Sequence, residues 1–145
     1  MGNEVNYAAA ARRHLSDGRI LQGQGRHANA GQLFGFSVEC GIKALLLACG
    51  VARGADGGVV ENNKLRAHLP VLTTRVSTCG HLIPEGPKAS SYMAMLTQLQ
   101  DLDDWTVDHR YWDEAAIPLT SLPAWERLAA EANAMLDQAR LDGVL

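Results

Sequence analysis

The sequence is short of cysteines, metal-binding spacings and positive charge. Its 145 residues hold three cysteines, an odd number without C-x-x-C spacing, which argues against a disulfide framework and favours reduced core residues in a cytoplasmic protein. It has no His-x-x-x-His spacing and no Cys/His cluster, so we expect neither a bound metal nor another cofactor. The formal net charge of -3 excludes broad electrostatic binding of nucleic acid, although it is compatible with a local basic patch.

The sequence also shows no pattern typical of a signal peptide or of a membrane span. No apolar segment follows a basic start at the N-terminus, and the longest apolar run is interrupted by Glu39, Lys43 and glycines. We therefore expect no membrane partner. Because the chain has the length of one ordinary domain, we predict a single domain over 1–145, with its core at about 5–140.

The longest apolar run, from Leu33 to Val51, reads LFGFSVECGIKALLLACGV. Its length and its Ala and Leu content predict a helix, and at about 100° per residue Gln32, Glu39 and Lys43 fall in one narrow stripe. The rest of this helix has no polar face, so it belongs in the centre of the fold. A charged pair there must be paired, hydrogen-bonded or aimed at something, so the stripe is either a structural polar lock or a site in which Lys43 contacts an anion.

Apolar periodicity predicts helices elsewhere and no strand. We expect helices at about 5–22, 28–49 and 88–103, a short helix at about 70–80, and a last helix from Ser121, which is a suitable N-cap. Residues 51–63 have loop composition, and the stretch from Trp105 to Leu119 is an irregular connector. The prediction is an all-α, up-and-down bundle of four to five helices.

The connector holds the densest group of aromatic and basic residues. Arg110 and Tyr111 are flanked by Trp105, His109 and Trp112. A guanidinium beside aromatic rings suits phosphate contact and base stacking on single-stranded RNA or a nucleotide. Alternatively, the aromatic rings pack the connector onto the bundle while Arg110 pairs with a neighbouring aspartate. Acidic neighbours weaken the nucleic-acid interpretation.

Two histidines outside the connector lie at informative positions. His68 precedes Pro70 at a helix entrance, where its side chain can cap that helix, reach back to Glu39, or act as an acid, a base or a phosphate contact. His14 lies on the apolar side of the first helix, which favours a core histidine over a ligand.

Taken in order, these segments resemble a prokaryotic HEPN domain. The resemblance rests on Tyr7 to Leu21, on Gly25 to Leu46 with Phe36, Glu39 and Lys43, on His68-Leu69-Pro70, and on Trp105 with Arg110-Tyr111. It implies a small helical bundle that forms a homodimer and is often paired with a minimal nucleotidyltransferase in toxin-antitoxin-like systems.

The HEPN family includes metal-independent ribonucleases, whose signature is Arg-x(4 to 6)-His near the start of the last long helix. No histidine follows Arg110 in this chain, and the literal match from Arg75 to His81 lies well before the last helix. We therefore expect a non-catalytic or degenerate member that binds a nucleotide, RNA or a cognate nucleotidyltransferase through Glu39, Lys43, His68, Arg110 and Tyr111. One alternative is a ribonuclease that uses Arg110 with His68 or His109 as acid and base. Another is a purely structural dimerisation module.

Overall fold

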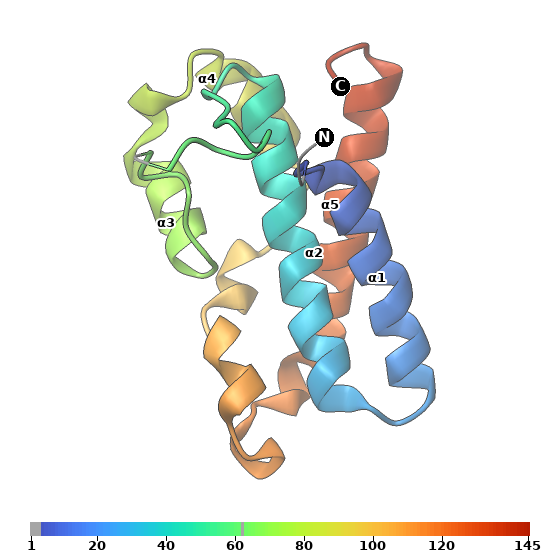
Figure 1. Cartoon of the computed structure of the whole chain (residues 1–145). Helices are drawn as coiled ribbons and strands as arrows, with labels where there is room; N and C mark the ends of the chain where they lie inside the picture. Colours follow the sequence, from blue (N-terminus) through green and yellow to red (C-terminus); the bar gives the residue numbers. More distant parts are fainter. Residues whose placement is uncertain (1–3, 62) are drawn as a thin grey trace.

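A computed structural model describes residues 4–61 and 63–145 and confirms an all-α bundle (Figure 1). Its five α-helices are α1 (Tyr7–Gly23), α2 (His27–Ala48), α3 (Val71–Thr78), α4 (Gly86–Met93) and α5 (Leu122–Leu141). The described residues form no strand, and their nearest approach to one is an isolated bridge between Arg53 and Val59. Both termini of the described chain lie at the same end of the bundle as α4 (Figure 1).

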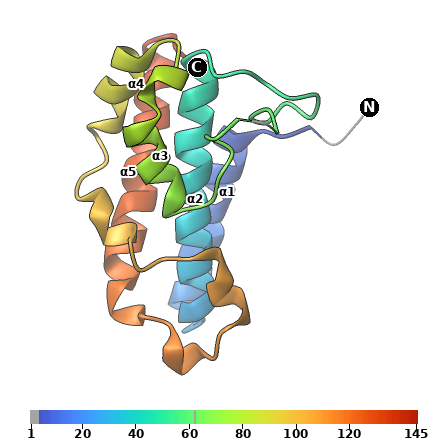
Figure 2. The same ribbon diagram turned by 90° about the vertical axis from the view of Figure 1, so that its left-hand side faces the viewer.

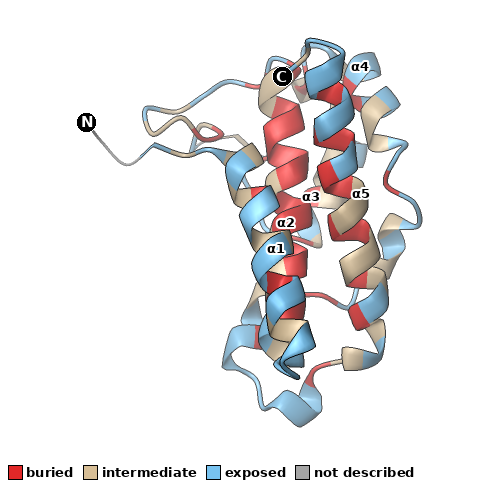
Figure 3. Ribbon diagram, turned by 90° about the vertical axis from the view of Figure 1, so that its right-hand side faces the viewer, coloured by how far each residue is buried: buried red, intermediate tan, exposed pale blue. Residues whose placement is uncertain are grey.

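The three long helices α1, α2 and α5 form the core. α1 and α2 make an antiparallel hairpin whose turn contains Gly25 at φ +75, a conformation that glycine adopts without steric cost. α2 crosses α5 closely, because a Cβ on Gly41 would lie 3.0 Å from the Cβ of Ala132. Figure 3 shows buried residues along α2 and along the inner sides of α1 and α5. The central position predicted for α2 is therefore confirmed.

Judged by length and composition alone, α2 is also long and apolar enough to cross a membrane. In its most apolar window, however, 78% of the residues are buried inside the protein. A buried core helix passes the same test, so this property fits the place of α2 in the bundle.

The predicted helix over 88–103 is wrong in its second half. α4 ends at Met93, and Gln98 has φ 53, which no helix accommodates. The apolar residues whose spacing predicted one helix lie in a turn and in a 3-10 helix, η2 (Leu99–Leu102). Leu96 reaches the core from the turn and Leu102 from η2. Thr97 is held there by Glu131 of α5, which accepts from its backbone N–H (3.0 Å) and its hydroxyl (2.6 Å).

The predicted irregular connector is a run of 3-10 turns, η3 (Val107–Tyr111), η4 (Glu114–Ala116) and η5 (Leu119–Ser121). It lies at the end of the bundle opposite α4, and Figure 2 shows the same placement from a second direction. Ser121 precedes α5 as expected but does not cap it through its side chain, because its hydroxyl donates to the carboxylate of Asp104.

Residues 51–61 form the predicted loop, and residue 62 lies outside the described residues. The loop packs beside the start of α1, where the N–H of Val5 donates to the carbonyl of Asp56 (2.7 Å). The Tyr7 hydroxyl accepts from the N–H of Val59 (3.2 Å). These contacts hold the loop against the start of α1.

Candidate functional site

The carboxylate of Glu39 is the centre of a buried polar group, which we call the Glu39 cluster: Glu39, Lys43, His68 and Leu69. Glu39 is 5% exposed. It accepts from Lys43 Nζ (3.2 Å), from the backbone N–H of Leu69 (3.0 Å) and from His68 Nδ1, which is 3.1 Å from both oxygens. A buried carboxylate is tolerated when it is paired and hydrogen-bonded, and this one is both.

Lys43 is enclosed on its other side. It is 6% exposed, and its ammonium lies 5.8 Å from the centre of the Tyr7 ring. Its charge is matched by Glu39 in a pair whose side chains are 8% and 6% exposed. The pair therefore joins α2 to the start of α1 and to the segment before α3, which favours a structural polar lock over an anion contact by Lys43.

His68 is the exposed member of the Glu39 cluster, with 59% of its side chain accessible. A carboxylate only accepts, so His68 Nδ1 carries the hydrogen in their contact. In the neutral ring Nε2 is then the nitrogen with a free lone pair. The predicted contact between His68 and Glu39 is present, and it holds the imidazole in one orientation for proton transfer or hydrogen bonding at the surface.

Arg110 and Tyr111 lie on η3, away from the Glu39 cluster. η3 attaches to α2 where Gln32 Nε2 donates to the carbonyl of Val107 (3.4 Å), and Gln32 precedes Glu39 by two helical turns, about 10 Å. In the described part of the chain no hydrogen bond or ion pair links Arg110 or Tyr111 to the Glu39 cluster. The structure thus divides the predicted site residues into two groups.

Two of the aromatic side chains that were predicted to pack the connector onto the bundle are exposed instead. Tyr111 is 74% exposed and Trp112 is 47% exposed, so neither packs the connector onto the bundle. The guanidinium of Arg110 lies 4.8 Å from the centre of the Tyr111 ring. Asp104, an expected partner of Arg110, instead accepts from the Ser121 hydroxyl and from Trp125 Nε1 (3.1 Å).

His109 is turned into the protein beneath this surface. It is 4% exposed, with its ring centre 4.7 Å from that of Trp112 and 5.9 Å from that of Trp125. Burial lowers the pKa of His109, although Asp104 and Asp108 oppose the shift. A neutral, enclosed ring at this position supports Trp112 and presents almost no surface to a substrate.

Trp105 anchors the connector, a role predicted from the sequence only for the aromatic residues as a group. It is fully buried and its Nε1 donates to the carbonyl of Gly31 (2.9 Å). Its ring lies against Gly35, where α2 has no side chain, and packs edge-on against Phe36 with ring centres 5.5 Å apart. The spacing of Gly31 and Gly35 on one face of α2 is the signal that could have located this groove.

Two further titratable side chains, one on α1 and one on α2, have shifted pKa values. His14 is half-buried, 5.9 Å from Phe36 between ring centres, and burial lowers its pKa, with Arg13 acting in the same direction. Burial, reinforced by Glu39, raises the pKa of Cys40 to about 11, so its thiol is protonated and unreactive at neutral pH. Within residues 4–61 and 63–145, no three His, Cys, Asp or Glu side chains gather as a metal site would require.

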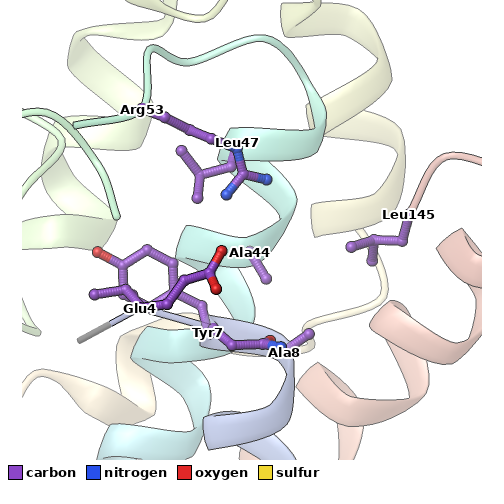
Figure 4. Close-up of a pocket in the computed structure, with 9 residues that line it drawn as sticks. Glu4, Tyr7, Ala8, Ala44, Leu47, Arg53 and Leu145 are labelled. Atoms are coloured by element: carbon purple, nitrogen blue, oxygen red, sulfur yellow. The ribbon is translucent and has the colours of Figure 1, made fainter. Parts of the chain in front are cut away.

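A pocket of about 480 Å³ lies between the start of α1, the end of α2 and the 51–61 loop (Figure 4). Glu4 and Arg53 face it from opposite sides, and Tyr7, Ala44 and Leu47 contribute to its lining. The pocket shares Tyr7 with the Lys43 contact. It does not include His68, Arg110 or Tyr111.

Comparison of the chain with protein-family models, with curated proteins and with solved structures finds no match.

Proposed function

We propose that the chain is a HEPN-like helical protein with a binding role, taking a nucleotide, RNA or a cognate minimal nucleotidyltransferase in a toxin-antitoxin-like pair. The observation that carries this proposal is the exposure of Tyr111, 74%, with Arg110 lying over its ring. Aromatic and arginine side chains are the residues that dominate binding energy at interfaces, and here they are presented together on one short turn.

The burial of Glu39 and Lys43 supports a structural role for this pair and not a catalytic one. Both side chains are almost fully buried and their charges are matched by each other, so neither presents its charge to a ligand at the surface. The same contacts hold three segments of the fold together. The missing histidine after Arg110 points the same way, since the ribonuclease signature of the resembling family is incomplete.

The binding proposal is tested by thermal unfolding with ATP, AMP and a short single-stranded RNA, each at millimolar concentration. A ligand present at about a hundred times its Kd should raise the Tm by roughly 5–10 °C, because it binds only the folded state. Arg110→Ala and Tyr111→Ser should weaken that binding at least tenfold, whereas Leu141→Ser should not, although Leu141 is 82% exposed. Unchanged Tm values with all three ligands would contradict the nucleotide and RNA forms of the proposal.

The Glu39–His68 contact favours a second candidate, a metal-independent endoribonuclease. His68 would take a proton from a ribose 2′ oxygen as that oxygen attacks the adjacent phosphorus. The 5′ oxygen of the next nucleotide would then leave, taking a proton from water, and the remaining product would carry a 2′,3′-cyclic phosphate. The oriented and 59% exposed imidazole suits the first of these proton transfers.

The ribonuclease candidate predicts cleavage of labelled single-stranded RNA in the presence of a chelator. His68→Gln should reduce the rate by about a hundredfold or more, because it removes the proton acceptor. His81→Gln is the matched control, since His81 is also exposed but lies on η1 (Gly80–Leu82) rather than beside Glu39. Intact RNA after incubation with the wild-type protein would rule this candidate out.

We also propose that the protein forms a homodimer, as the resemblance implies. Half-buried apolar side chains follow one face of α2, namely Leu33, Phe36, Cys40 and Leu47. Light scattering is expected to give twice the chain mass of 15.6 kDa. A monomer at micromolar concentration would contradict this proposal and the alternative of a dimerisation module.

A further inference from the structure

We propose that the turn carrying Tyr111 and Trp112 binds a basic surface of another protein and not a nucleic acid. This inference rests on the binding role proposed above and selects among its ligands. We call the surface the η3 surface: Asp103, Asp104, Asp108, Arg110, Tyr111, Trp112, Asp113 and Glu114, all exposed.

The aromatic centre of the η3 surface is held in place. Trp112 packs edge-on against the buried ring of His109, which in turn lies beside Trp125. The turns on either side are fixed by side-chain caps, because Thr106 accepts from the N–H of Asp108 (3.2 Å) and Asp113 accepts from the N–H of Ala115 (2.9 Å). Exposed aromatic rings on an ordered support lose little entropy on binding, which is the condition for a protein-binding hot spot.

The charge around this centre is strongly negative. The η3 surface has five carboxylates and one guanidinium, a formal charge of -4. None of its carboxylates forms an ion pair within the described part of the chain. Asp104 is the best satisfied, and its two donors, Ser121 and Trp125, are both neutral. The negative charge therefore faces solvent.

This charge decides between the two kinds of partner. Nucleic-acid affinity comes largely from Lys and Arg side chains that neutralise phosphates. Here five carboxylates surround a single Arg110, so the net negative charge repels a phosphate backbone. At physiological salt the Debye length is about 8 Å, so each of these exposed carboxylates acts on the part of a docking partner that lies within that distance. A protein surface with Lys or Arg around an apolar hollow complements both the rings and the charge.

The experiment is selection from a library of random twelve-residue peptides displayed on phage, with the intact protein as bait. We expect the enriched peptides to combine an apolar residue with flanking Lys or Arg. Their affinity for Tyr111→Ser and Trp112→Ser should fall at least tenfold, and for the double variant Asp108→Asn/Asp113→Asn several-fold. Leu141→Ser and Asp17→Asn, which change an exposed apolar and an exposed acidic residue outside the η3 surface, should bind like the wild type.

A single-stranded RNA twelve nucleotides long is measured with the same variants. RNA binding that Tyr111→Ser abolishes would overturn this inference but keep the proposed binding role. Neutral or acidic enriched peptides, or basic peptides that bind Tyr111→Ser and Trp112→Ser unchanged, would also overturn it. If neither peptides nor RNA nor nucleotides bind, the inference fails together with the nucleotide and RNA forms of the proposed function.

Discussion

Replacing Glu39 with methionine is expected to lower the free energy of unfolding by about 3–5 kcal/mol. The substitution leaves the Lys43 ammonium buried at 6% exposure without its counter-charge. It also leaves the N–H of Leu69 and Nδ1 of His68 without the carboxylate that accepts from them. The loss should appear as a lower midpoint in urea-induced unfolding at fixed protein concentration.

Lys43→Met should cost less than Glu39→Met, because Glu39 keeps two of its donors. The double variant should be more stable than Glu39→Met alone, since it removes the unpaired charge. The matched control is Arg12→Met, which breaks the exposed Arg12–Asp137 pair at 2.7 Å with a change of about 1 kcal/mol or less. A Glu39→Met loss as small as that of Arg12→Met would mean that the cluster does not hold the fold together.

The fold was predictable where one periodicity governed a long segment. α2 is apolar on every face except the stripe of Gln32, Glu39 and Lys43, and such a helix has only a central position available. The same stripe predicted that Glu39 and Lys43 would be buried and paired. The approach of His68 to Glu39 was one of several alternatives, because the sequence does not show how the chain returns to α2 after the 51–61 loop.

The prediction failed where apolar residues kept a helical spacing without a continuous helix. Leu96, Leu99 and Leu102 continue the spacing of α4, but each reaches the core through a turn. Glu131 of α5 replaces the missing helical hydrogen bonds at Thr97, and a contact between residues 34 positions apart leaves no local signal. Tertiary contacts thus override local propensity here.

The candidate site was predicted in composition but not in arrangement. The sequence grouped Trp105, His109, Tyr111 and Trp112 as one aromatic patch, yet the structure buries the first two and exposes the other two. Short 3-10 helices joined by irregular residues do not share one side-chain period, so periodicity does not predict which of these residues are buried. The exposure of Tyr111 and Trp112 depends on where Trp105 is anchored, and that anchor is a groove in α2.

Replacing Gly35 with alanine tests that anchor, and we expect a loss of about 3 kcal/mol or more. A Cβ at position 35 would fall on the indole ring of Trp105, far inside van der Waals contact. Trp105 cannot yield easily, because it is fully buried, donates to Gly31 and packs against Phe36. The indole must leave its groove, and the connector that carries Tyr111 must move with it.

A graded series of glycine substitutions separates this steric effect from the general effect of alanine in a helix. Gly31→Ala should cost less than Gly35→Ala, since its Cβ would lie 2.8 Å from a ring atom of Trp125. Gly23→Ala, with no atom within 4 Å of the added Cβ, should change stability by about 1 kcal/mol or less, in the favourable direction. Equal midpoints for the three variants in urea would show that the Trp105 groove does not fix the connector. The expected order would show that the exposed aromatic surface is supported from the centre of α2.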